Sequence, residues 1–454
     1  MRRILSYAVV AIATLSDAAR AFEAGVAVTD VTPPVGLVTW GYGSEAPKTT
    51  GVLDPLYARA LVLRAGDDTL AIVTLDLGRP PLPDRVAAIR KRAAKAGVDY
   101  VLITASHTHQ APPMDVDEPY TRTIADQIGD TIEAAAAKLA PARIGVGRTT
   151  IDIAHNRRKI LANGQCMMVW RNAEMVPLGP LDQEAGLIKI ESESGGLMAV
   201  LVNYACHPVV LSWDNTQYSA DWVGEMARVV KQETGAECMF LQGGCGDINP
   251  YLDKTPLAEG GLESMHTVGR TAGYRVVHAL HSFDAQAPAT PSIRVTESRV
   301  EVGTRWDLTD PKNQKTLRGI VGDAMYNKYL TKLKPDLSVP VQTILLNDNL
   351  ALAAMPGEMF AQFQLDLKTH SPVNDTFLVG YANEFHVYFP TIKDSVFRGY
   401  GAVMNTYVGL GAGHKLITQS LLDIGRLMGR LSPDPTPEDF VILEEGPPDP
   451  TAVP

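Results

Sequence analysis

Short apolar runs alternate with longer amphipathic stretches along most of this sequence. The runs at 56–64, 69–75 and 100–105 are rich in leucine and β-branched residues, and each predicts a buried strand. At 83–96 and 120–139 the apolar residues recur at helical spacing, which predicts two helices. Because strands alternate with helices, the pattern favours an α/β fold with layered, mixed β-sheets that are flanked by helices.

The same alternation continues through the second half of the chain. Residues 142–153 predict a pair of strands, and Ser219–Asp221 is a candidate cap for the helix that follows. Further strands are expected at 186–192, 197–205, 238–241, 350–355 and 377–381. Further helices are expected at 222–234, 262–282, 311–333 and 415–431, and one more helix follows residue 358 and ends at about residue 370. No internal repeat or clear linker divides the chain. We therefore expect one large domain at 22–431, followed by a tail at 432–454 that is rich in proline and acidic residues.

The first 21 residues have the pattern of a secretory signal peptide. Two arginines precede an apolar run at 4–15, and Ala19 and Ala21 supply the small residues before a cleavage site. The run is too short to span a bilayer, although an uncleaved anchor is the alternative interpretation. We predict an exported protein, periplasmic or secreted, whose mature chain begins near Phe22. Mass spectrometry of the native protein tests this prediction, and an intact Met1 would contradict it.

The composition is that of an ordinary globular protein, with 45% hydrophobic and 20% charged residues. The net charge of −10, with no basic run to offset it, argues against a nucleic-acid partner. No segment after the signal peptide predicts a transmembrane helix. The sequence leaves the oligomeric state open.

Four cysteines, at 166, 206, 238 and 245, lie in the middle of the chain. None is in a CxxC pair, so a structural zinc site built from cysteines is not expected. An oxidising compartment would permit disulfides among them, and three pairings are then possible.

Several predicted strands lead directly into side chains that bind metals or carry charge. Strand ends in layered α/β folds meet at one edge of a sheet, where ligand sites gather. Two histidines and a carboxylate, with one position left open, are a common catalytic zinc set. Taken singly, each of these residues is better explained by a structural role, but their joint placement predicts a metal site. The residues concerned are His107, His109, His207, Asp247, Glu358 and Tyr388.

Six short motifs also stand in a recognisable order. They are residues 104–109, Asn156–Arg157, His207 after its strand, 246–250, 356–358, and Tyr388 followed by Tyr400. In this order they resemble the catalytic domain of the neutral/alkaline, non-lysosomal ceramidase family, and the resemblance runs from about residue 24 to about residue 410.

The resemblance implies a role for each matched residue. It assigns His107, His207, Glu358 and Tyr388 as ligands of one zinc ion per chain. It places His109, Arg157 and Tyr400 in the catalytic pocket.

Two departures from the family pattern bear on the substrate. Asn249 stands where ceramidases carry a serine, and its amide cannot act as a nucleophile, although it can hydrogen-bond a substrate oxygen. The resemblance also implies an immunoglobulin-like domain after the catalytic domain, whereas only the tail at 432–454 follows here.

The favoured hypothesis is a zinc-dependent hydrolase that cleaves an N-acyl amide through a metal-activated water. His109 would carry a proton to the leaving amine, or else support the metal site. The substrate would be a small or lipid-like acyl compound. One alternative is a zinc esterase or amidase that acts on a non-sphingolipid acyl substrate. The other is a catalytically silent zinc-binding protein.

Overall fold

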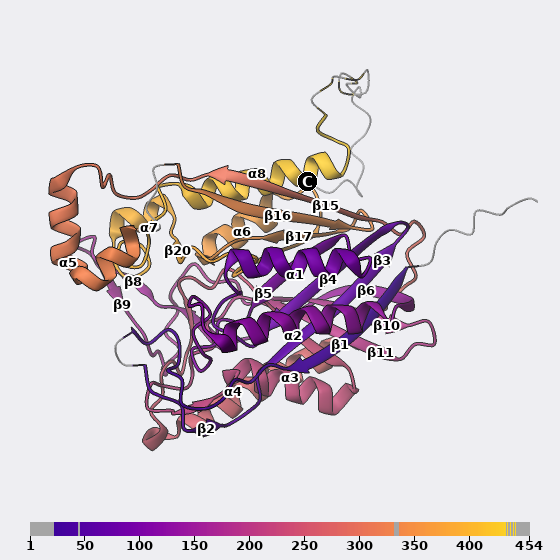
Figure 1. The fold of residues 1–454 in the computed structure, drawn as a ribbon, viewed down its shortest axis with the longest axis horizontal. Coiled ribbons are helices and arrows are strands. Elements are labelled where there is room, and N and C mark those ends of the chain that lie inside the picture. The colour runs from indigo at the N-terminus through magenta and orange to yellow at the C-terminus, as the bar shows by residue number, and fades with distance from the viewer. Residues whose placement is uncertain are drawn as a thin grey trace, which may run out of the picture.

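The structure, a computed structural model, describes residues 22–432 except 44–45 and 331–335, together with residues 434, 436, 439 and 441. The predicted signal peptide lies outside the described residues, as does most of the predicted tail. The described chain forms four layers, in the order helices, sheet, sheet, helices (Figure 1). The predicted α/β fold with layered, mixed sheets is confirmed.

The larger sheet has eight strands in the order β13-β11-β10-β6-β1-β3-β4-β5. Its middle strands run antiparallel, whereas β13 beside β11 and β5 beside β4 are parallel pairs. The strands are β1 (Glu23–Asp30), β3 (Tyr57–Ala65), β4 (Asp68–Leu75), β5 (Tyr100–Ala105), β6 (Ala140–Thr150), β10 (Glu184–Ser192), β11 (Leu197–Tyr204) and β13 (Glu237–Gln242).

Helices cover one face of this sheet and a second sheet covers the other. The helices are α1 (Pro83–Lys95), α2 (Pro119–Ala136), α3 (Asp221–Thr234) and α4 (Gly261–Ala279). Successive side chains of a strand point to opposite faces of the sheet, so they pack in different hydrophobic cores. In β3, for example, Ala60 and Val62 pack against the helices, while Leu61 and Leu63 face the second sheet.

The second sheet has four strands, in the order β15-β16-β17-β19. They are β15 (Ile293–Glu301), β16 (Ser338–Leu346), β17 (Leu350–Ala354) and β19 (Asp375–Val379). Its outer face is covered by α6 (Ala361–His370) and α8 (Ala412–Leu427), which supply Phe363, Leu367 and Leu416 to a separate core. The shorter elements are β2 (Gly51–Val52), β7 (Ala154–Asn156), β8 (Arg158–Ile160), β9 (Cys166–Met168), β12 (Gln217–Tyr218), β14 (Ile248–Pro250), β18 (Glu358–Met359), β20 (Tyr388–Phe389), η2 (Leu257–Glu259), α5 (Pro311–Leu330) and α7 (Ile392–Phe397).

The two sheets approach closely where Gly186 of β10 meets Phe377 of β19. A Cβ atom added at Gly186 would lie 2.3 Å from a carbon of the Phe377 ring. Since such overpacking costs about 1–3 kcal/mol, Gly186→Ala should lower the free energy of unfolding by that amount. The matched control is Gly196→Ala, because a Cβ there would meet only the Ser192 hydroxyl, at 3.3 Å. Denaturant unfolding measures the stability of both variants. If Gly186→Ala were as stable as Gly196→Ala, the two sheets could separate at no cost.

One local prediction was wrong. Residues 142–153 do not form a pair of strands, because β6 runs unbroken to Thr150 and is paired with β10 along that length. The N-cap of α3 is Ala220, within the predicted segment, and its own side chain makes no cap. The Ser219 hydroxyl accepts from the amide of Asp221 at 2.9 Å and donates to Asp54, and Oδ1 of Asp221 accepts from the amide of Trp222 at 2.7 Å.

The four cysteines are free thiols, so none of the three possible disulfide pairings is present. Cys206, Cys238 and Cys245 are buried. Among the described residues no helix combines the length and the apolar character that a membrane crossing needs.

Candidate metal centre and catalytic pocket

The ends of strands from both sheets meet at one place. The Thr104 hydroxyl, in β5, donates to the carbonyl of Gly380 beyond β19 at 2.8 Å. The Gly380 amide donates in turn to the carbonyl of Gln242, the last residue of β13, also at 2.8 Å. The loops that follow these strands and β11 are therefore brought together, as the sequence pattern predicted.

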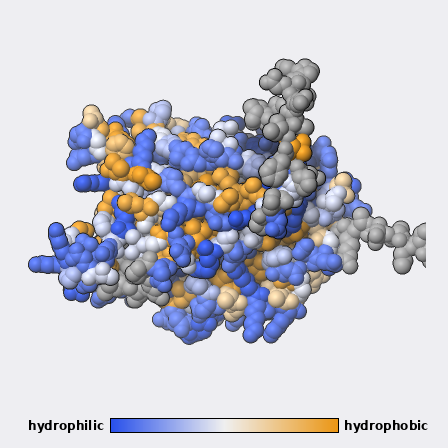
Figure 2. Space-filling view, turned by 90° about the horizontal axis from the view of Figure 1, so that it is seen from above, coloured by the Kyte–Doolittle hydropathy of each residue, from blue (hydrophilic) through white to orange (hydrophobic). Residues whose placement is uncertain are grey.

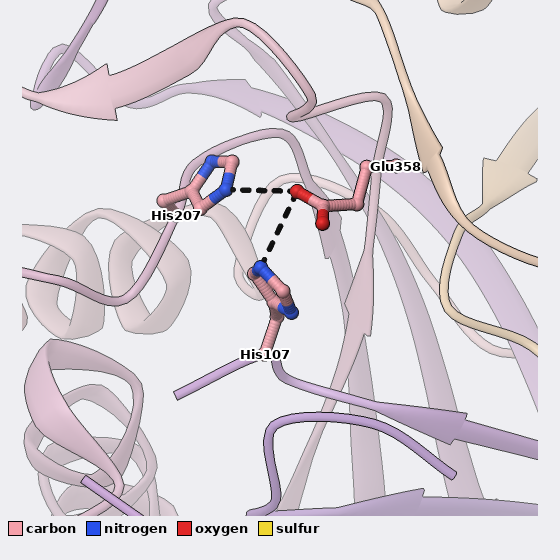
Figure 3. Close-up of side chains that lie close together, drawn as sticks. All are labelled: His107, His207 and Glu358. Carbon is pink, nitrogen blue, oxygen red and sulfur yellow. Dashed lines mark hydrogen bonds and ion pairs between the residues drawn. The ribbon is translucent and has the colours of Figure 1, made fainter. Parts of the chain in front are cut away.

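Three of the predicted residues converge at this edge, as Figure 3 shows. The Nε2 atoms of His107 and His207 lie 3.4 and 3.3 Å from the same oxygen, Oε2 of Glu358. All three side chains are buried, and one ligand atom of each lies within 4.8 Å of the others. This group could hold a metal ion.

The hydrogen bonds of the two imidazoles explain why a cation fits here. Nδ1 of His107 lies 2.8 Å from the carbonyl of Gly78, and Nδ1 of His207 lies 2.9 Å from the carbonyl of Ile248. A carbonyl only accepts, so each Nδ1 carries the proton and, in a neutral ring, each Nε2 carries a lone pair. Burial lowers the pKa of His207 to about 4, so its ring is neutral at pH 7. With both rings neutral, two lone pairs and a carboxylate would face one another, and a metal ion would satisfy all three.

Tyr381, which sequence reasoning missed, is part of this centre. Its hydroxyl donates to Oε2 of Glu358 at 3.3 Å and lies 3.1 Å from Sγ of Cys245. Its ring packs on His107, with the centroids 4.1 Å apart. Tyr381 and His107 both have left-handed backbones, with φ of 52° and 74°, which are uncommon for residues other than glycine and cluster at functional sites. No sequence motif marks the tyrosine, although it follows the strand β19.

Tyr388 lies directly opposite Glu358, because β20 and β18 pair in parallel at these two residues. Its hydroxyl accepts a hydrogen bond from Nη2 of Arg157 at 3.1 Å. Burial raises the pKa of Tyr388 well above its usual value, so the phenol is protonated at neutral pH. The pairing places Tyr388 beside the histidine–glutamate group, where the resemblance expected a fourth ligand.

Arg157 is buried, and no carboxylate pairs with it among the described residues. Besides Tyr388, its guanidinium donates to the carbonyl of Gly246 at 2.6 Å and to Oδ1 of Asn249 at 3.0 Å. Its Nε is buried without a partner among the described residues. The guanidinium also lies over the rings of Trp170 and Tyr400, 5.1 and 5.2 Å from their centroids.

His109 is surrounded by rings. Its imidazole lies edge-on to Trp40, Tyr42 and His107, with centroid distances of 5.5, 5.2 and 5.1 Å. Both ring nitrogens are buried and have no hydrogen-bond partner among the described residues. Burial lowers the pKa of His109 well below its usual value, so the ring is neutral at pH 7.

Asn249 has both ends of its amide engaged within the protein. Its Oδ1 accepts from Arg157, and its Nδ2 donates to Oδ2 of the buried Asp253 at 2.7 Å. The Asp253 carboxylate also pairs with Lys254, at 2.7 and 2.9 Å. In this arrangement the Asn249 side chain holds the guanidinium of Arg157, and both its Oδ1 and its Nδ2 are bonded to protein groups.

Asp247, in the glycine-rich loop, fixes the backbone around Arg157. One carboxylate oxygen accepts from Nδ2 of Asn156 at 2.7 Å, and the other accepts from the amide of Ala361 at 2.8 Å. Ala361 is the first residue of α6, so the carboxylate also lies at the positive end of a helix. Burial raises the pKa of Asp247 to about 6. Its role is structural: it ties the 156–158 segment to α6.

A model of the N-terminal part of the neutral/alkaline non-lysosomal ceramidase family matches residues 22–261, just over half of the chain. The chain belongs to this family. The neutral ceramidase of Pseudomonas aeruginosa is 24% identical over 296 residues, which cover 59% of this chain and 42% of that protein. The chain therefore spans about two fifths of the length of the curated relative it matches.

Solved structures support the family's fold. The crystal structure of neutral ceramidase from Pseudomonas aeruginosa superposes with a TM-score of 0.72 at 18% identity, covering 91% of this chain and 75% of that one. A ceramidase complexed with C2 superposes with a TM-score of 0.71 at 17% identity, covering 92% and 76%. The predicted family resemblance is confirmed.

For this ceramidase-family chain, the structure gathers the predicted site residues around one point. His107, His207 and Glu358 meet directly, and Tyr388 joins them through strand pairing. Tyr400 lies further out, with its ring 5.5 Å from that of Tyr388 and its hydroxyl accepting from Asn405 at 2.9 Å.

Proposed function

We propose that this chain is a zinc-dependent amidohydrolase that cleaves the amide bond of an N-acyl, ceramide-like substrate. The observation that carries the proposal is the convergence of two imidazole Nε2 atoms on one carboxylate oxygen at 3.3–3.4 Å, in a buried setting at strand ends. Family membership supports amide hydrolysis as the reaction.

The donor set suits zinc, which binds imidazole nitrogen and carboxylate oxygen. His107, His207 and Glu358 would hold one ion, with Tyr388 as the fourth protein ligand. When bound, zinc supplies a Lewis acid and lowers the pKa of a coordinated water to about 7.

Arg157 and Tyr400 are suited to stabilise negative charge on the amide oxygen. The unpartnered Nε of Arg157 is a donor that no described residue satisfies. Tyr400 accepts from Asn405, which leaves its own hydroxyl proton free to be donated. A well-placed donor of this kind is typically worth about 3–4 kcal/mol in the transition state.

His109 is suited to proton transfer. Cleavage of an amide requires a proton on the leaving nitrogen, and a neutral imidazole can take one from water and pass it on. Asn249, by contrast, cannot form an acyl intermediate, and its amide is committed to Arg157 and Asp253. We therefore expect no acyl-enzyme burst.

A substrate panel tests this function. The purified protein should hydrolyse N-acyl amides, and the rates for a long-chain ceramide and for short, water-soluble N-acyl amides give the acyl and amine specificity. Because Asn249 replaces the family serine, the panel also includes non-sphingolipid amides, and faster turnover of those than of ceramide would assign the alternative, non-sphingolipid substrate. Turnover of p-nitrophenyl esters without any amide turnover would make the protein an esterase. Zinc binding without any turnover would make it a binding protein.

A further inference from the structure

Three segments of the chain meet beside Tyr400. They are the β8–β9 hairpin (158–168), the helix α7 and the loop 398–411. Arg158 joins them, since its guanidinium donates to Asp394 in α7 at 3.2 Å and to the carbonyl of Arg398 at 2.6 Å. A Cβ atom added at Gly399 would lie 2.9 Å from Sγ of Cys166 in β9. These three segments are called the rim below. Figure 1 places α7, β8 and β9 at the same end of the molecule.

Large apolar side chains of the rim are exposed. Single exposed apolar residues are normal on protein surfaces, but a group on adjoining segments indicates an interaction surface. At this end of the molecule Figure 2 shows hydrophobic residues interspersed with hydrophilic ones. The exposed side chains and their exposed fractions are Val396 (70%), Leu410 (63%), Met404 (57%), Ile392 (54%), Ile160 (42%) and Met167 (42%).

The rim is basic, although the chain as a whole is acidic. It holds four basic residues and one acid, Asp394, so its net charge is +3, against −10 for the chain. Asp394 is paired with the buried Arg158. The three remaining basic residues, Lys159, Lys393 and Arg398, are exposed.

The rim adjoins the residues of the candidate site. Tyr400 belongs to the loop 398–411, and its ring lies 5.5 Å from Tyr388 and 5.2 Å from Trp170. Trp170 is 37% exposed and lies over Arg157. Tyr400 and Trp170 therefore lie beside both the rim and Arg157, next to the candidate metal centre.

We propose that the rim docks on the surface of an anionic lipid bilayer and presents the pocket to lipids in that bilayer. Exposed apolar side chains enter the interfacial region, and lysine and arginine are attracted to acidic headgroups. The charge contrast favours this partner over a second copy of the chain, because two copies would bring together two surfaces of net charge +3. Docking itself does not depend on the proposed amidohydrolase function, whereas the entry of substrate from the bilayer rests on it.

Co-sedimentation with vesicles tests the docking. The protein should bind vesicles of phosphatidylcholine mixed with phosphatidylglycerol, should bind pure phosphatidylcholine weakly, and should be released by salt. The double variant Lys393→Glu/Arg398→Glu should lower the vesicle partition coefficient by at least roughly fivefold per residue, since each basic side chain near such a surface contributes about that factor. Val396→Asp/Leu410→Asp should also prevent binding.

The matched controls lie outside the rim, on helices that cover the larger sheet. Lys95→Glu in α1 and Tyr274→Asp in α4, where Tyr274 is 53% exposed, should bind as the unmodified protein does. Rim variants that bind anionic vesicles normally would overturn the proposal. The proposal would also be overturned if the protein were a dimer in solution and Val396→Asp/Leu410→Asp dissociated it, because the rim would then join two copies of the chain.

Activity separates this proposal from the proposed function. The rim variants should cleave a water-soluble N-acyl amide at the unmodified rate and lose turnover only of an amide embedded in anionic vesicles. If no amide is cleaved at all, the proposed function fails, while the vesicle binding still decides the docking. Equal losses on soluble and embedded substrates would show that the rim acts on the pocket and not on lipid access.

Discussion

Glu358→Ala should release the metal and lower amide hydrolysis by more than about a hundredfold. Among the residues that the structure describes, Glu358 supplies the only carboxylate of the centre, and its Oε2 faces both histidine nitrogens. Loss of a residue that merely supports a ligand already costs about 10- to 100-fold in metal affinity or activity, so loss of a ligand should cost more. Elemental analysis of the purified variant and its rate on an N-acyl amide measure the two effects.

A matched carboxylate is available as a control. Glu384 is also paired with a histidine, His386, at 2.8 Å, but it does not belong to the centre. Glu384→Ala should retain metal and most of the activity. Circular dichroism of both variants shows whether the fold survives. Full metal occupancy in folded Glu358→Ala would refute the assignment of this ligand.

Arg157→Lys should lower kcat by about 10²–10³ while the metal stays bound. Lysine keeps the positive charge but loses the planar fork, which here contacts Tyr388, Gly246 and Asn249 at the same time. The readout is kcat for a soluble N-acyl amide together with the metal content. Asn249→Ala, which removes only one of these contacts, should cost roughly ten- to a hundredfold.

Arg59→Lys is the control that shows whether replacing any buried arginine by lysine lowers kcat. Arg59 is likewise buried and has a charged partner, Asp76, at 2.8 Å, but it lies in β3 and does not belong to the group formed by His107, His207 and Glu358. Its replacement should reduce stability and leave kcat unchanged. A fall in kcat for Arg59→Lys as large as that for Arg157→Lys would assign the effect to folding.

The sequence predicted most of the regular elements, because strand and helix periods are set by which residues are buried. The run 100–105, for example, is β5, and His107 follows it directly. The strand pair predicted at 142–153 was wrong, since the pairing of β6 with β10 is a long-range contact that local pattern does not encode. The predicted signal peptide and most of the predicted tail lie outside the described residues.

The candidate site could be predicted only in part. His107, His207 and Glu358 follow apolar strands, so periodicity alone pointed to them. Arg157 and Tyr400 came from the family resemblance, because the feature that singles them out is three-dimensional: Arg157 lies over the Tyr400 ring.

Tyr381 was missed because its hydroxyl contacts residues far away in the sequence, Glu358 and Cys245. The hydrogen bond from Asn249 to Asp253 could not be predicted either, since it depends on the turn of the chain after β14.

The central claim is that the group formed by His107, His207 and Glu358 holds a zinc ion on which amide hydrolysis depends. The most direct test is zinc titration of chelator-treated protein, with hydrolysis of a soluble N-acyl amide as the readout. The account predicts no hydrolysis by the metal-free protein and full recovery at about one zinc per chain, as a mononuclear site requires. Undiminished hydrolysis by the verified metal-free protein would contradict it.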